Sequence, residues 1–180
     1  RRRYARYRTD ADLQAAHAAL PWIVVWDDHE TANNSWAQGA ENHDPDSQGV
    51  WNIRRDAALQ AYFDGMPVRT SSTSDEGHIY RSFTFGDLAE LTIMDLRTYR
   101  DRETDNASTA TNPARTMLGS EQFTWLSNKI ESSNVSWNVL GNSVMFSPLN
   151  LVPLNDDPGT SSVSTALSAN IADLTSTINN

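Results

Sequence analysis

The chain has 180 residues, enough for one domain with a sizeable core, but only 38% of them are hydrophobic, which is low for a compact domain. Its formal net charge is −9, and although arginines crowd the first eight residues, acidic residues dominate the remainder, so we expect no specific nucleic-acid binding. The absence of cysteine excludes disulfides and thiolate metal sites, and the sequence shows neither a signal peptide nor an apolar run long enough for a transmembrane segment.

A helix is expected over residues 3–19, because Ala, Leu, Gln and Arg dominate and neither Gly nor Pro interrupts them before Pro21. Residues 22–27 are predicted to form a strand, since this short apolar run is rich in the β-branched residues Ile and Val. Four ionisable side chains, Asp27-Asp28-His29-Glu30, stand where the strand would leave its sheet. In open α/β sheets this is where sites form.

The residue types of this stretch suit metal binding and proton transfer. Asp27 and Asp28 are adjacent carboxylates, which are costly to ionise together unless a cation lies near. Carboxylate oxygens suit hard ions such as calcium, manganese or iron, and imidazole suits zinc or iron. Histidine is the side chain whose unperturbed pKa lies nearest neutrality, so a histidine at position 29 suits acid or base work. The alternative is a solvated acidic loop that caps the following helix.

Two other catalytic classes, zinc proteases and glycosidases, also use residues of these types. The helical zinc-protease signature needs a second histidine four residues after His29, and Asn33 occupies that position, so the signature fails. A glycosidase needs two carboxylates facing each other across its substrate. The neighbouring Asp27 and Asp28 would point to opposite faces of an extended segment, but a pairing with a distant carboxylate stays open.

A long polar loop is expected from Asn33 to Gly49, and long loops in compact domains are usually functional. Asn33 and Asn34 are predicted to orient the metal ligands through hydrogen bonds. Trp36 either forms a lip of a substrate cleft or packs the loop down.

The remaining elements follow from periodicity and turn residues. A helix is expected over 50–64, and a hairpin over 79–85 and 88–96 around the turn Gly86-Asp87. A further helix is expected over 119–132, with Ser120 as N-cap and with Phe123, Leu126 and Ile130 facing inward. A last strand is expected over 137–140.

Four residues at strand ends are further site candidates. Asp95 either ligates a metal or belongs to an ion-paired network that fixes the strand exit, and we favour the network. Arg97 and Arg100 are alternatives for binding a phosphate oxygen of the substrate, and we favour Arg97. Asn142 either ligates a metal through its amide oxygen or shapes the pocket.

The segment Trp26-Asp27-Asp28-His29-Glu30, followed by Asn33-Asn34, resembles the signature of PhoD-like alkaline phosphatases, a branch of the calcineurin-like metallophosphoesterases. Further segments follow in the order of that family over roughly residues 1–150. They include Tyr4-Ala5-Arg6-Tyr7-Arg8, Gly39-Ala40-Glu41-Asn42-His43, Arg54-Arg55-Asp56-Ala57-Ala58-Leu59-Gln60-Ala61-Tyr62, Met66-Pro67-Val68-Arg69, Tyr80-Arg81-Ser82-Phe83, Met94-Asp95-Leu96-Arg97-Thr98-Tyr99-Arg100-Asp101 and Gly141-Asn142-Ser143-Val144-Met145-Phe146.

The resemblance implies an α/β (α+β) fold that is part of a metallophosphoesterase αββα sandwich. Residues 1–150 would be the central part of the phosphatase domain, and residues 151–180 a polar insertion or linker. The implied activity is metal-dependent hydrolysis of phosphate mono- or diesters by a metal-bound hydroxide, and the implied metals are calcium and iron. The resemblance also implies a secreted, extracytoplasmic protein, which we expect to be monomeric.

The resemblance also assigns roles within the signature. Asp28 takes the place of a metal-binding residue, His29 that of the catalytic histidine and Glu30 that of the adjoining acid, while Asp27 stands where the wider superfamily has glycine. The superfamily's Asp-rich strand end before this segment and its Gly-Asp-x-His segment after it are missing, so we expect an internal part of a longer protein. The alternative function is a non-catalytic fragment or a calcium-binding structural or interaction domain.

Overall fold

The computed structural model describes residues 1–69, 78–104 and 106–145. Arg1–Arg102 and Met117–Val144 form one compact unit, which holds the described strands and all described helices except α5. The other unit includes Glu103–Thr116 and the short helix α5 (Ala107–Ala110). The expected linker over 151–180 lies outside the described residues.

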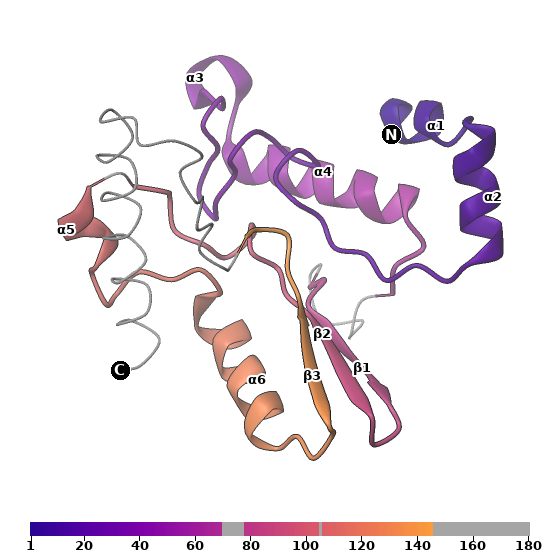
Figure 1. The fold of residues 1–180 in the computed structure, drawn as a ribbon. Coiled ribbons are helices and arrows are strands. Elements are labelled where there is room, and N and C mark those ends of the chain that lie inside the picture. Colours follow the sequence, from indigo (N-terminus) through magenta and orange to yellow (C-terminus); the bar gives the residue numbers. More distant parts are fainter. Residues whose placement is uncertain (70–77, 105, 146–180) are drawn as a thin grey trace, which may run out of the picture. The chain divides into compact units, whose positions relative to one another are not determined.

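The helix expected over 3–19 is two helices, α1 (Arg2–Tyr7) and α2 (Ala11–Ala19) (Figure 1). The break follows from Asp10, whose carboxylate accepts the backbone N–H of Leu13 at 2.8 Å and so caps a new helix. Asp is favoured at such N-caps because it satisfies an N–H that the helix leaves unpaired.

The prediction of a strand over residues 22–27 is wrong: among the described residues, this segment forms no strand and pairs with none. The carbonyl of Val24 instead accepts a hydrogen bond from the Arg81 guanidinium at 2.7 Å. Val24 and Val25 pack against a core cluster of Trp26, Tyr62 and Ile79. The apolar character of the segment therefore serves packing rather than a sheet.

The predicted hairpin and last strand are confirmed. β1 (Arg81–Phe85) pairs antiparallel with β2 (Ala89–Ile93), and β2 pairs parallel with β3 (Trp137–Gly141), giving the order β1-β2-β3. Gly86 takes φ +60° in the hairpin turn, a conformation that favours glycine.

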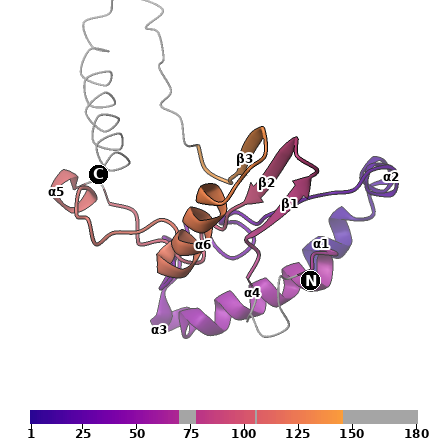
Figure 2. The ribbon, with the colours of Figure 1, turned by 90° about the horizontal axis from the view of Figure 1, so that it is seen from below.

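The two faces of the sheet differ in polarity. Helix α6 (Gly119–Glu131) lies along the face that carries Glu90 and Asn138 (Figures 1 and 2): Lys129 Nζ donates to Glu90 Oε1 at 2.6 Å and Ser133 donates to Asn138 at 2.9 Å. The register places apolar side chains on the opposite face, namely Phe83, Phe85, Ala89, Leu91, Ile93, Trp137 and Val139. We call this set the apolar sheet face.

Part of the apolar sheet face is accessible in the described structure. Phe85 is 53% exposed, Trp137 67% and Val139 46%. Aromatic and aliphatic side chains gathered on one face of a sheet normally pack against another layer. The described sheet therefore has the character of one layer of a larger sandwich.

The predicted range of α6 is confirmed, but its N-cap and its buried residues differ from those predicted. Its N-cap is Leu118, without a side-chain cap, rather than Ser120. Leu126 is buried as expected, whereas Phe123 and Ile130 are 60% and 47% exposed. The buried polar residue is Gln122, whose side chain bonds to the chain leaving β2.

The helix expected over 50–64 is α4 (Trp51–Gly65), and the polar loop before it contains the short helix α3 (Pro45–Gln48). Tyr62 of α4 packs edge-on against Trp26 with ring centroids 5.4 Å apart. Every described helix is too short or too polar to span a bilayer.

The Lys129–Glu90 ion pair predicts a pH-dependent contribution to stability. The Lys129 ammonium lowers the pKa of Glu90, so the pair stabilises the fold fully above the unfolded-state pKa of about 4.3 and loses this effect as pH falls through the lowered folded pKa. We expect Lys129→Met to destabilise by about 1 kcal/mol at pH 7, because the ion pair is partly exposed, and by less at pH 3. Urea titrations of the variant at both pH values measure this, with Glu131→Gln as the control. An equal loss at both pH values would contradict the assignment.

Candidate functional site

The signature segment forms a compact turn directly after the buried Trp26. The N–H groups of Thr31 and Ala32 both donate to the carbonyl of Asp28, at 2.9 and 2.8 Å. Asn34 takes φ +50°, a left-handed conformation that asparagine tolerates better than most residues. We call residues 27–34 the signature turn.

Asp27 of the signature turn forms an ion pair with Arg97, which follows β2. Arg97 Nε donates to Asp27 Oδ1 at 2.6 Å, and the two side chains are 11% and 45% exposed respectively. The Arg97 guanidinium, predicted to face a substrate phosphate, is thus largely buried against a carboxylate. This pairing removes much of the repulsion expected between Asp27 and Asp28.

The Asp28 carboxylate is held in place by the backbone of the signature turn itself, because its Oδ2 accepts the backbone N–H of Asn34 at 2.6 Å. Burial raises the pKa of Asp28, but the Asn34 N–H and the charges of Arg97 and His29 outweigh burial and leave the pKa below its ordinary value. Asp28 is therefore ionised throughout the neutral range, as a metal ligand must be.

His29 is exposed and begins a short hydrogen-bond chain. Its Nε2 lies 3.0 Å from Asn33 Oδ1, and Asn33 Nδ2 donates to Glu41 Oε2 at 2.6 Å. Because an amide oxygen only accepts, this arrangement places a proton on Nε2 and leaves Nδ1 available. Asn33 thus holds the His29 imidazole rather than a predicted metal ligand, and Glu41 is a partner that the sequence did not reveal.

Glu30 binds the backbone at the start of the signature turn. Its Oε2 accepts the N–H of Asp27 at 2.8 Å. Burial and the negative charge of Glu30 raise the pKa of the Tyr62 hydroxyl to about 12. The arrangement supports Glu30 as a brace of the turn.

Two arginines that follow β2 fasten the end of the signature turn. Arg100 donates through Nη2 to Asn34 Oδ1 and through Nε to the carbonyl of Ser35 at 2.9 Å. Arg97 Nη1 lies 3.4 Å from the same Asn34 oxygen. Asn34 therefore contacts both arginines as well as Asp28. Arg100, the alternative to Arg97 for binding a phosphate oxygen, is 6% exposed and is bound to the end of this turn instead.

Two candidates stand apart from these contacts. Asn142 is exposed after β3, and no hydrogen bond between the described residues joins it to the signature turn. Trp36 packs against its own loop. Its backbone N–H donates to the carbonyl of Gly39 at 2.8 Å, and the Arg102 guanidinium lies 5.2 Å from the centre of its ring. This contact favours loop packing over a cleft lip.

The described residues do not complete a metal centre. No group of three or more His, Cys, Asp or Glu residues is placed to hold a metal ion within residues 1–69, 78–104 and 106–145. Among the described residues, Asp27 and Asp28 each have one carboxylate oxygen engaged in a side-chain contact, to Arg97 and to the Asn34 N–H, and the other oxygen of each is available to a cation. The donor chemistry suits part of a ligand set but not a whole one.

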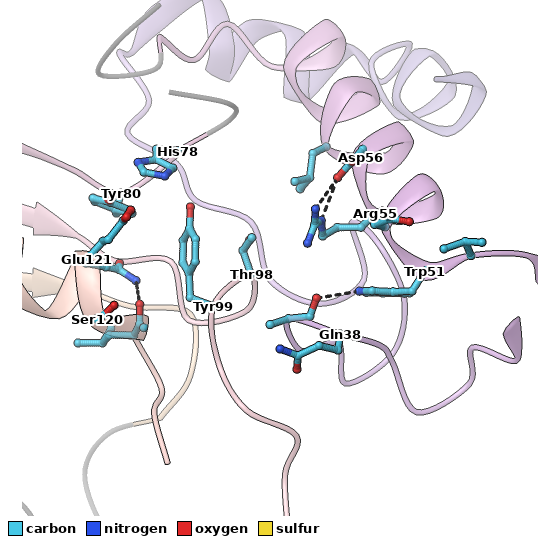
Figure 3. Close-up of a pocket in the computed structure, with 17 residues that line it drawn as sticks. Gln38, Trp51, Arg55, Asp56, His78, Tyr80, Thr98, Tyr99, Ser120 and Glu121 are labelled. Atoms are coloured by element: carbon cyan, nitrogen blue, oxygen red, sulfur yellow. Dashed lines mark hydrogen bonds and ion pairs between the residues drawn. The ribbon is translucent and has the colours of Figure 1, made fainter. Parts of the chain in front are cut away.

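A cavity of about 850 Å³ lies elsewhere in the same unit, and Figure 3 shows Thr98 and Tyr99 between the side chains of α4 and those at the start of α6. Its lining contains none of the predicted site residues. Burial, followed by the charge of Asp95, raises the pKa of Tyr99, so its hydroxyl stays protonated at neutral pH. The cavity is therefore distinct from the signature turn.

Comparisons with known proteins agree on one family. A model of the PhoD-like phosphatase family matches residues 1–178. Alkaline phosphatase D of Bacillus subtilis (strain 168) is 44% identical over 158 residues, covering 83% of this chain and 27% of that protein. A solved structure of PhoD matches with a TM-score of 0.73 and 43% identity, covering 79% of this chain and 28% of that one.

The structural match confirms the expected α/β fold class. The chain spans little more than a quarter of the length of these two proteins. The family model covers nearly the whole chain, including the signature turn and the strands. The chain therefore belongs to the PhoD-like phosphatase family.

Proposed function

We propose that the full-length protein carrying this chain hydrolyses phosphate mono- or diesters, and that the signature turn forms one wall of its metal-dependent active site. The observation that carries the proposal is the juxtaposition of an exposed, oriented His29 with the ionised Asp28 in a chain of a phosphatase family. An extracytoplasmic location is proposed with it, on the family resemblance alone.

His29 is the group that we assign to the leaving oxygen of the ester. The Asn33–Glu41 chain fixes its ring and keeps a proton on Nε2. Protonated on both nitrogens, the imidazole would donate a proton to the departing alkoxide or stabilise its charge. The exposure of His29 leaves it accessible to substrate.

Asp28 and Asp27 are proposed to supply part of the ligand set for a metal, with calcium and iron as the candidates. Among the described residues each carboxylate has one oxygen available for this purpose, and Arg97 balances the charge of Asp27. When bound, the metal would polarise the phosphate and activate the attacking water. The remaining ligands would come from outside the described residues.

Metal removal tests the proposal. We expect the purified full-length protein to hydrolyse p-nitrophenyl phosphate or bis(p-nitrophenyl) phosphate, and a chelator to lower turnover by at least about 100-fold, since a metal supplies several kcal/mol of transition-state stabilisation. Adding back calcium and iron should restore the rate. Turnover that survives complete metal removal would contradict the metal assignment. Calcium-dependent thermal stabilisation without hydrolysis would support the calcium-binding structural domain instead.

A further inference from the structure

The chain leaving β2 carries a buried carboxylate that the proposed chemistry does not use. Asp95 is 0% exposed, and its Oδ1 accepts two backbone N–H groups, from Arg97 at 3.0 Å and from Thr98 at 2.9 Å. Among the described residues Asp95 forms no ion pair, so the expectation of an ion-paired network is wrong for this part of the chain: the carboxylate is bound by the backbone that follows it. Two such hydrogen bonds close a tight turn at Arg97.

Helix α6 also binds Asp95, through the backbone rather than the carboxylate of that residue. Gln122, which is 1% exposed, accepts the backbone N–H of Asp95 through Oε1 and donates through Nε2 to the Asp95 carbonyl, both at 2.8 Å. Nε2 also donates to the carbonyl of Leu118 at 3.0 Å. We call Asp95 and Gln122 the strand-exit clamp. Because buried hydrogen bonds are costly to leave unmade, the clamp fixes the backbone where β2 ends.

The clamp lies two residues before the arginine that reaches the signature turn. The backbone N–H of Arg97 is bound to Asp95, while its guanidinium is bound to Asp27 at 2.6 Å. The path from α6 to the turn therefore runs through Gln122, Asp95 and Arg97 without a solvent-exposed link, since Arg97 is itself largely buried. A shift of the strand exit would carry the Arg97 guanidinium with it.

We propose that Asp95 is a positioning residue of the active site, which sets Arg97 against Asp27 and thereby fixes the signature turn that carries Asp28 and His29; this inference rests on the proposed phosphate-ester hydrolysis. Asp95 touches neither substrate nor the reacting atoms. Its effect passes through the placement of Arg97, and Gln122 supports it in this role.

The atoms of Asp95 allow positioning to be separated from direct ligation. Its Oδ1 accepts both hydrogen bonds from the backbone N–H groups of Arg97 and Thr98, whereas Oδ2 is buried without a hydrogen-bond partner among the described residues. Asparagine keeps an oxygen that can accept both N–H groups but loses the negative charge. Alanine loses the acceptor as well. A positioning role therefore tolerates Asp95→Asn, whereas in a metal-ligating role the change would weaken metal binding, because a neutral amide oxygen holds a cation less tightly than a carboxylate.

The test compares kinetics of the full-length protein with bis(p-nitrophenyl) phosphate. For Asp95→Ala we expect kcat to fall by about 10- to 100-fold with KM within about threefold, because small misplacements of catalytic groups cost this much. For Asp95→Asn we expect kcat within about threefold of the wild-type value. An equal loss in both variants, or an unchanged kcat in Asp95→Ala, would overturn the proposal.

Leu126→Ala is the matched control for lost stability. Leu126 lies on α6 in the buried cluster with Met94 and Leu96, next to Asp95, but takes no part in the clamp. At equal loss of thermal stability, its kcat should stay near wild type. If Asp95→Ala does not fold, Gln122→Leu replaces it, with the same expected fall in kcat. A fall in the Leu126 variant as large as in the clamp variants would reduce the clamp to a structural role.

A crystal structure of the Asp95→Ala or Gln122→Leu protein gives a readout independent of activity. We expect Arg97 Nε to leave Asp27 Oδ1, and an intact ion pair would overturn the inference. If the wild-type protein hydrolyses neither ester and the variant still loses the ion pair, the proposed function fails while the role of the clamp in placing Arg97 stands.

Discussion

Replacing His29 with alanine is expected to lower the turnover of the full-length protein by about 100- to 10,000-fold, the range that one general acid or base contributes. Bound calcium and iron should stay near the wild-type content, because the proposed metal ligands are Asp28 and Asp27, each held by contacts that His29 does not make. Steady-state kinetics and elemental analysis of the same preparation measure both quantities.

His17→Ala is the matched control for the His29 variant. His17 lies in α2, outside the signature turn, and stacks on Trp22 with ring centroids 4.7 Å apart. Its loss should leave turnover unchanged. Unaltered turnover in His29→Ala would contradict the catalytic role given to His29. A loss of bound metal together with turnover would indicate that His29 is a metal ligand instead.

Trp26→Ala is expected to destabilise the protein by about 3–5 kcal/mol, the cost of removing a large buried aromatic side chain. Trp26 is 1% exposed and packs edge-on against Tyr62 and Phe63, with ring centroids 5.4 and 5.7 Å away. Alanine would leave a cavity directly beneath the signature turn. Urea unfolding followed by circular dichroism gives the change in free energy of unfolding.

Trp22→Ala removes the same side chain four residues earlier, where Trp22 is 50% exposed. We expect this control to lose well under half as much stability, since its partial exposure leaves less apolar area to lose. Equal losses in the two variants would show that burial at Trp26 does not hold this part of the core together.

Elements held together by local interactions could be predicted from the sequence. The hairpin β1–β2 depends on alternating residues and on Gly86 in its turn, both visible in a few consecutive positions. Helices α4 and α6 likewise carry their own periodicity and ends. The parallel partner of β2 was predicted as a strand, but its pairing comes from residues far along the chain.

The errors arose where a distant or competing partner decides the outcome. Residues 22–27 have the β-branched composition of a strand, yet a strand also needs a neighbour with which to pair, and composition does not supply one. The single side chain of Asp10 ended the first helix early by offering a better cap than the helix interior.

The candidate site shows the same division. The signature turn is continuous in sequence, so Asp28, His29 and Asn33 could be selected in advance. Arg97 was selected for its charge, but its contact with Asp27 joins residues 70 positions apart. Arg100 was likewise noted for its charge, but its contacts with Ser35 and Asn34 join residues 65 and 66 positions apart. Gln122 carried no local signal, because a buried glutamine is recognised only by what surrounds it.

The apolar sheet face has a consequence for how this protein is synthesised. β1 and β2 leave the ribosome before β3, so Phe83, Phe85 and Leu91 emerge on a hairpin whose edges are unpaired. Such a nascent hairpin is prone to associate with its neighbours. The Arg81 guanidinium lies 5.4 Å from the centre of the Phe83 ring and places a charge on this surface early. Expression at lower temperature weakens apolar attraction and should therefore favour correctly folded chains over aggregates.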